Sequence, residues 1–405
     1  MTNNWRTPVV VLIFGGAVLS LSLGIRHGFG LFLQPMSDAY GWGRETFAFA
    51  IALQNLVWGA AQPFSGMIAD RYGAGRVVVA GGMLYALGLV LMAMSDSGLT
   101  LGLSAGVLIG LGLSGTAFSV VYGAVGRAFP PEKRSVAFGI AGAAGSFGQF
   151  AMLPVSQSLI GGLGWFASLL VLAVLALMMS PLAAALAERR DAPGASAISS
   201  QSLREALREA GAHRGFWLLC FGFFVCGFQV VFIAVHFPAF IVDQGLPVEV
   251  GMLGLALIGL FNIFGSYTAG HLGARFRRKY LLSYLYLARA AVISVFLLLP
   301  ITPVSVYVFS ALMGLLWLST VPLTNGVVAQ IFGVKYLATL FGFVFFGHQV
   351  GSFLGVWLGG RLFDATGSYG TVWLITIGLG VVAALLHWPI DDRELARAPV
   401  AGRAA

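Results

Sequence analysis

Apolar stretches long enough to cross a lipid bilayer follow one another along almost the whole chain, with short polar breaks between them. A transmembrane helix needs about 20 mostly apolar residues. Only 9% of the 405 residues are charged and 58% are apolar, whereas water-soluble domains contain about 25% charged residues. A soluble globule is excluded, and the chain is predicted to be an all-α polytopic membrane protein with twelve spans. They lie at residues 8–35, 46–69, 77–95, 99–126, 135–159, 163–187, 216–242, 248–270, 281–299, 304–330, 337–362 and 369–389.

One polar connection, residues 188–214, is much longer than the others and divides the spans six and six. This division predicts an N-terminal six-helix bundle in residues 1–187 and a C-terminal six-helix bundle with a short tail in residues 215–405. The apolar run at 8–35 is too long for the core of a signal peptide, and no small-residue cleavage site closes it. We therefore take this run as the first span.

The basic residues fall almost entirely on one side of the predicted topology. Of the 23 Lys and Arg residues, nineteen lie in the loops and tails of that side, and Arg44 and Arg361 lie on the other. Because Lys and Arg collect in cytoplasmic loops, both termini are expected in the cytoplasm and the protein in the inner membrane. The net charge of +8 is then an insertion signal. No segment offers the contiguous basic face that a nucleic-acid partner needs.

The two halves resemble each other in sequence. The string from Gly66 to Arg71 recurs at Gly270 to Arg275, a shift of 204, and Phe138-Gly139 recurs as Phe341-Gly342, a shift of 203. Transporters built from such repeats bind their substrate near the membrane midplane, between the repeats, and work by rocking one half against the other.

The loop after the second span carries Gly66-x-x-x-Asp70-Arg71-x-Gly73-x-Gly75-Arg76. It resembles the signature loop of the major facilitator superfamily, as do the twelve spans and their division. The resemblance implies a monomeric carrier in which Gly66, Asp70, Arg71, Gly73 and Arg76 form a conformational latch on the cytoplasmic side. In the second repeat Ala274 replaces the acid, so that latch is expected to be weaker.

Four shorter strings, at residues 28–32, 40–44, 129–134 and 364–369, are similar to the monocarboxylate transporter and oxalate/formate antiporter branch. Members of that branch commonly hold the substrate carboxylate with a basic residue in span 8. The matching segment here keeps Asn262 but has Ser266 where the cation should stand. The anion clamp, if there is one, must come from other residues.

The ionisable residues inside the spans are all basic, because Asp and Glu are absent from the middle of every span. An ionisable group at membrane depth is expensive and by default functional. Arg26 is the first candidate for holding an anion; the alternative is a guanidinium satisfied by backbone carbonyls. Arg289 could replace the cation missing beside Ser266, or pair with carbonyls or a hydroxyl such as that of Ser283. The list is Arg26, His27, His236, Arg289 and His348.

Histidine can change its charge near neutral pH, so His348 could bind a carboxylate and also carry a coupling proton; a hydrogen-bonded packing role is the alternative. Its neighbour Gln349 is a further candidate for substrate binding, and His27 a further candidate for the proton. Other polar residues at cavity depth are Gln54, Asn55, Tyr122, Gln149, Asn262, Thr324 and Asn325. Tyr122 and Asn262 are the two we place in the predicted substrate site.

Cations without a compensating acid favour anions, since an opposite charge 4 Å away contributes about 4 kcal/mol at an effective dielectric constant near 20. The predicted function is secondary active transport of a small organic anion by alternating access, with proton symport. Anion exchange, efflux of hydrophobic compounds and a non-transporting membrane sensor are the alternatives. No metal-ligand set, nucleophile elbow or phosphate loop is present in the sequence, so no cofactor and no enzymatic activity are expected.

Overall fold

The computed structural model describes residues 5–42, 44–187 and 201–395, and all regular secondary structure in these ranges is helical. Ten helical stretches there are long and apolar enough to cross a membrane. One of them, Pro131–Leu186, turns at Gly164, where φ is 76°, and so contains two of the predicted spans. The 29-residue helix Arg44–Tyr72 stands outside the ten because Gln54, Asn55 and Gln62 make it less apolar. These elements correspond to the twelve predicted spans, and the all-α membrane fold is confirmed.

The first six spans are partly broken into shorter helices. They comprise α1 (Pro8–His27), the 3₁₀ turn η1 (Gly28–Phe32), α2 (Leu33–Tyr40), α3 (Arg44–Tyr72), α4 (Ala74–Ala93), α5 (Gly98–Leu101), the π-helical turn η2 (Gly102–Leu108), α6 (Ile109–Thr116), α7 (Phe118–Ala128), α8 (Pro131–Leu177) and α9 (Met179–Leu186).

The second six spans follow a short amphipathic helix, α10 (Leu203–Ala212). They comprise α11 (Arg214–Asp243), α12 (Val248–Arg275), α13 (Arg278–Leu298), α14 (Pro303–Leu316), α15 (Thr320–Phe332), α16 (Leu337–Thr366) and α17 (Gly370–His387). Of the predicted central loop 188–214, residues 188–200 lie outside the described residues. The remainder forms α10, which begins with a reciprocal cap between Ser202 and Glu205.

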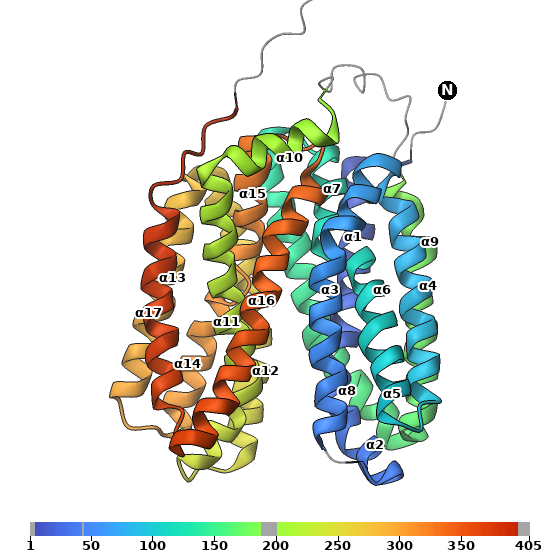
Figure 1. The fold of residues 1–405 in the computed structure, drawn as a ribbon, viewed down its shortest axis with the longest axis vertical. Helices are drawn as coiled ribbons and strands as arrows, with labels where there is room; N and C mark the ends of the chain where they lie inside the picture. Colours follow the sequence, from blue (N-terminus) through green and yellow to red (C-terminus); the bar gives the residue numbers. More distant parts are fainter. Residues whose placement is uncertain (1–4, 43, 188–200, 396–405) are drawn as a thin grey trace, which may run out of the picture.

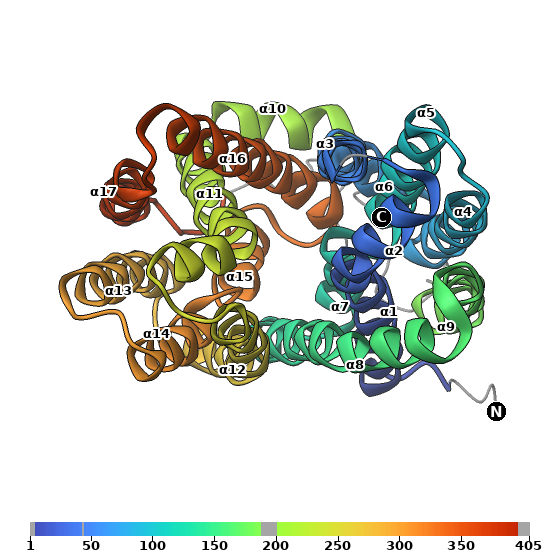
Figure 2. The same cartoon turned by 90° about the horizontal axis from the view of Figure 1, so that it is seen from below.

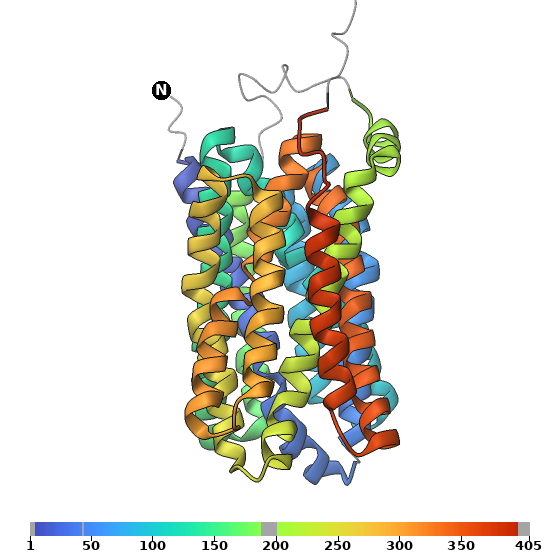
Figure 3. The same ribbon diagram turned by 90° about the vertical axis from the view of Figure 1, so that its left-hand side faces the viewer.

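The helices form two groups that stand side by side, one from the first half of the chain and one from the second (Figure 1). Most helices run along the long axis, as Figure 3 shows. We call the end that carries α10, the start of α1 and the end of α17 the basic end, because Arg71, Arg127 and Arg134 lie there. The other end carries α2 and the start of α14.

Two helix pairs join the halves, α3 with α16 and α8 with α12 (Figure 2). Their closest approaches lie in the parts of these helices nearer the basic end. A Cβ atom on Gly139 of α8 would stand 2.7 Å from the Cα atom of Gly270 of α12. A Cβ atom on Gly66 of α3 would collide with the backbone of Ala338 in α16. Glycine therefore permits the close contact that shuts the basic end in this conformation.

Candidate functional site

Arg26 is the penultimate residue of α1, and its half-buried side chain reaches α3. Its Nη2 atom donates a hydrogen bond to Asn55 Oδ1, and its guanidinium lies 5.1 Å from the centre of the Trp58 ring. The Arg26 Nε atom is buried and has no hydrogen-bond partner. A guanidinium has five N–H donors, so Arg26 retains capacity for another acceptor.

An aromatic path leads from Arg26 across to the other half. The Trp58 ring lies 4.9 Å from that of Phe345 in α16, and Phe345 stacks on His348 at 5.2 Å and 8° between planes. Phe223 of α11 contacts the same imidazole at 4.9 Å. The structure thereby brings two predicted site residues, Arg26 and His348, to opposite ends of one chain of contacting side chains.

Gln349 lies beside His348 and faces α3. Its Oε1 atom is 3.4 Å from His348 Nδ1, and its Cβ and Cγ atoms pack against Gly59. Its Nε2 atom is buried without a hydrogen-bond partner. Buried polar atoms are normally paired, and Arg26 Nε and Gln349 Nε2 are both donors. We call Arg26, Asn55, Trp58, Phe345, His348 and Gln349 the central site.

Arg289 is fully buried, and its donors are occupied within the C-terminal half. It donates to the carbonyls of Leu316 and Trp317, where the chain breaks between α14 and α15, and to Gln229 Oε1 at 3.3 Å. Cys226 lies 3.5 Å away and also contacts His348. None of the described hydrogen bonds of Arg289 goes to Ser266 or Ser283. The arginine thus serves as partner for carbonyls that the helix break leaves free.

Asn262 and Tyr122 are also completely buried and engaged in helix contacts. Asn262 donates to Ser146 Oγ at 2.9 Å and accepts from Leu318 N at 3.0 Å, so it ties α12 to α8 and to the α14–α15 break. The Tyr122 hydroxyl donates to the Phe138 carbonyl at 2.9 Å. Neither joins the central site. His27 is exposed at the end of α1, and no described hydrogen bond connects it to that site.

The predicted latch residues gather at the basic end. Asp70 is buried and accepts from Arg127 Nη1, Thr339 N and Thr339 Oγ1, each at 2.7 Å. Thr339 belongs to α16, so the carboxylate joins the two halves. Gly73 has a φ of 96° before α4 begins, a conformation that glycine adopts without strain.

The two basic latch residues are exposed: the Arg71 guanidinium lies 5.3 Å from the centre of the Tyr72 ring, and Arg76 faces outward. The sequence pattern did not predict the residues that bind the Asp70 carboxylate, which are Arg127 and Thr339. Arg127 carried a weak signal, as the last basic residue of its span, whereas Thr339 carried none.

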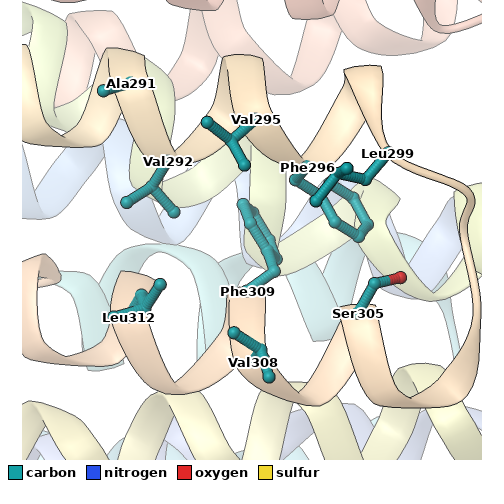
Figure 4. Close-up of a pocket in the computed structure, with 9 residues that line it drawn as sticks. All are labelled: Ala291, Val292, Val295, Phe296, Leu299, Ser305, Val308, Phe309 and Leu312. Carbon is teal, nitrogen blue, oxygen red and sulfur yellow. The ribbon is translucent and has the colours of Figure 1, made fainter.

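A groove of about 220 Å³ lies between α13 and α14, and Figure 4 shows the side chains that line it. Aliphatic side chains, two phenylalanines and the single hydroxyl of Ser305 line it. It contains no charged group and no residue of the central site. An apolar groove of this kind provides nothing that would hold an anion.

The profile described as Major Facilitator Superfamily matches residues 12–325 and 257–404. The chain belongs to the major facilitator superfamily. It is therefore a multi-pass membrane transporter and not an enzyme. The sequence is 26% identical to the uncharacterized MFS-type transporter YcxA of Bacillus subtilis over 98% of both chains. It is also 26% identical to human monocarboxylate transporter 11, over 95% of this chain and 83% of that protein.

Solved structures share the fold of this transporter. A variant of the Escherichia coli fucose:proton symporter FucP aligns with a TM-score of 0.71 at 15% identity, covering 94% of this chain and 98% of the other. The proton:xylose symporter XylE aligns with a TM-score of 0.74 at 15% identity, covering 95% and 96%. The predicted superfamily membership is confirmed, and monocarboxylate transporters are among the relatives.

Proposed function

We propose that this transporter moves a small organic anion of the monocarboxylate type through the central site, with a proton as the coupled ion. The observation that carries the proposal is the pair of unused donors, Arg26 Nε and Gln349 Nε2, on opposite halves of the molecule. In the described part of the chain, no carboxylate pairs with Arg26. A carboxylate supplies the missing acceptors, and guanidinium groups bind carboxylates in a bidentate way.

The aromatic contact between Trp58 and Phe345 joins α3 to α16 within the central site. In the proposed topology both termini and the basic end face the cytoplasm of the inner membrane. The anion enters from the opposite side while the Asp70 latch holds the basic end shut. Rocking of the halves then separates α3 from α16 and releases the anion inside. The protein works as a monomer in this scheme.

His348 is the proposed proton carrier. A lone anion moving toward a negative interior works against about 2.3 kcal/mol per 100 mV, and a proton that travels with it cancels this cost. His348 is 7% exposed, and its imidazole packs against the rings of Phe223 and Phe345. In this proposal the anion and the proton bind within the same central site and cross the membrane together.

The test is uptake into proteoliposomes of labelled formate, lactate, pyruvate, oxalate and benzoate, with and without an inward proton gradient. We expect one or more of these acids to accumulate, to depend on the gradient, and to be lost in Arg26→Ala while that variant remains monodisperse. Uptake unchanged by Arg26→Ala removes this residue from the site. Uptake that requires an anion inside and ignores the gradient indicates exchange instead of symport.

A further inference from the structure

Among the described residues, Asn55 is the one hydrogen-bond acceptor of Arg26. It lies one helical turn before Trp58 on α3 and is half-buried. Its Nδ2 atom donates to the Ile51 carbonyl at 3.1 Å, which fixes the orientation of the amide. The Oδ1 atom is thereby directed at Arg26 Nη2.

An amide oxygen resembles one oxygen of a carboxylate in size and in its role as acceptor, but it carries no full charge. The bond from Arg26 to Asn55 already has an ionised donor, so the advantage of a carboxylate is the added attraction between two full charges. A carboxylate that reaches Arg26 therefore competes favourably with Asn55 for the guanidinium. The amide can occupy the cation in the empty carrier without blocking the anion permanently.

We propose that Asn55 is a positioning residue that holds Arg26 in the empty transporter and that the carboxylate of the cargo displaces it. The inference rests on the proposed function and adds the residue that sets anion affinity. The contact with Asn55, together with the Trp58 ring 5.1 Å away, also explains how a half-buried cation without a carboxylate partner is tolerated. Tyr85 and His27 are the titratable groups that interact with Arg26 among the described residues.

The proposal makes opposite predictions for two substitutions at the same position. Asn55→Asp supplies a permanent internal carboxylate, so we expect carboxylate affinity to fall by about tenfold or more. Asn55→Ala removes the competitor, so we expect carboxylate affinity to become about threefold tighter. A residue needed only for packing would weaken binding in both variants.

The experiment uses the purified full-length chain and the same five acids, with thermal-shift titration as the readout of affinity. A second readout is the melting temperature without ligand, which Asn55→Asp should raise in the wild-type background but not together with Arg26→Ala. That difference shows that the new carboxylate pairs with Arg26.

The inference is overturned if Asn55→Asp binds the acids with wild-type affinity. It is also overturned if Asn55→Ala loses binding as completely as Arg26→Ala does. Either result leaves the proposed function intact. If the wild type itself neither binds nor transports any of the acids, the proposed function fails and the inference fails with it. Weak binding in Asn55→Asp together with retained binding in Asn55→Ala supports both.

Discussion

The two halves of the transporter share one fold but use their intramembrane arginines differently. Arg289 in the C-terminal half is fully buried and donates to two backbone carbonyls and to Gln229. Arg26 in the N-terminal half is half-buried, binds one amide oxygen and keeps an unpaired donor. The repeat shift of 203 makes Gln229 the residue of the second half that is equivalent in sequence to Arg26. The two halves therefore carry their intramembrane arginine at different positions of the repeat. A charge inside the membrane is a structural tie where neighbours provide enough acceptors; where they do not, as at Arg26, we propose that it is a binding group.

The basic end shows a similar difference. Asp70 joins α3 to Arg127 and to α16 of the other half. Its counterpart in the second repeat is Ala274, and the nearby carboxylate comes from the C-terminal segment. There the Asp392 carboxylate pairs with Arg277. The backbone carbonyl of Asp392 accepts a hydrogen bond from Gln330 Nε2 at 2.7 Å. This second pairing lies within one half, so it does not join the halves as Asp70 does.

The largest effect is expected from removing the structural arginine. Arg289→Leu leaves the carbonyls of Leu316 and Trp317 without partners, and each buried unsatisfied group costs about 1–3 kcal/mol. We expect the yield of monodisperse protein in size-exclusion chromatography and its melting temperature to fall sharply. Arg26→Leu is the matched control and should cost less stability. Equal losses in the two variants would mean that both arginines are structural.

The second effect concerns the latch. Asp70→Asn keeps an acceptor for Thr339 but removes the charge that pairs with Arg127. A change of about 1.4 kcal/mol in the free energy of the conformation that is closed at the basic end alters the equilibrium constant of that conformation about tenfold. We expect the maximal uptake rate to fall about tenfold and KM to change less than about twofold, measured in proteoliposomes. A change confined to KM would place Asp70 in substrate binding instead.

The third prediction concerns pH. In the proposed mechanism His348 takes up the coupled proton, so uptake by the wild type should rise as the external pH falls. His348→Gln preserves a polar side chain that cannot be protonated in this range. We therefore expect uptake that depends much less on pH between about 5 and 8. If the profile keeps its wild-type slope, another group carries the proton.

The smallest effect is expected at the second pairing of the basic end. The Arg277 side chain is 54% exposed whereas that of Asp392 is 3% exposed, and solvent weakens pairs of this kind. Asp392→Asn retains the backbone contact to Gln330. We expect a melting temperature within about 2 °C of the wild type and an unchanged uptake rate. A loss as large as that of Asp70→Asn would show that the C-terminal segment also controls the cycle.

Much of the fold could be predicted because apolar runs of bilayer length leave few alternatives to helices. The helix α10 was missed, although its cap residues Ser202 and Glu205 have the spacing of a capping box. Among the site residues, Arg26 and His348 stood out because charge is expensive in a membrane. Asn55, Trp58 and Phe345 did not, since nothing in their local pattern distinguishes them from other amides and aromatics of the spans.

The sequence by itself determined that the chain crosses the membrane many times, that its halves are related, and that its intramembrane charges are basic. These properties follow from the cost of placing polar groups in hydrocarbon, which acts on every residue wherever its neighbours are. Only the tertiary structure decided which arginine is satisfied and which is open, because that depends on acceptors from distant parts of the chain. Leu316 and Trp317 reach Arg289 across the fold, whereas the described residues offer Arg26 one amide oxygen, that of Asn55, beside the Trp58 ring.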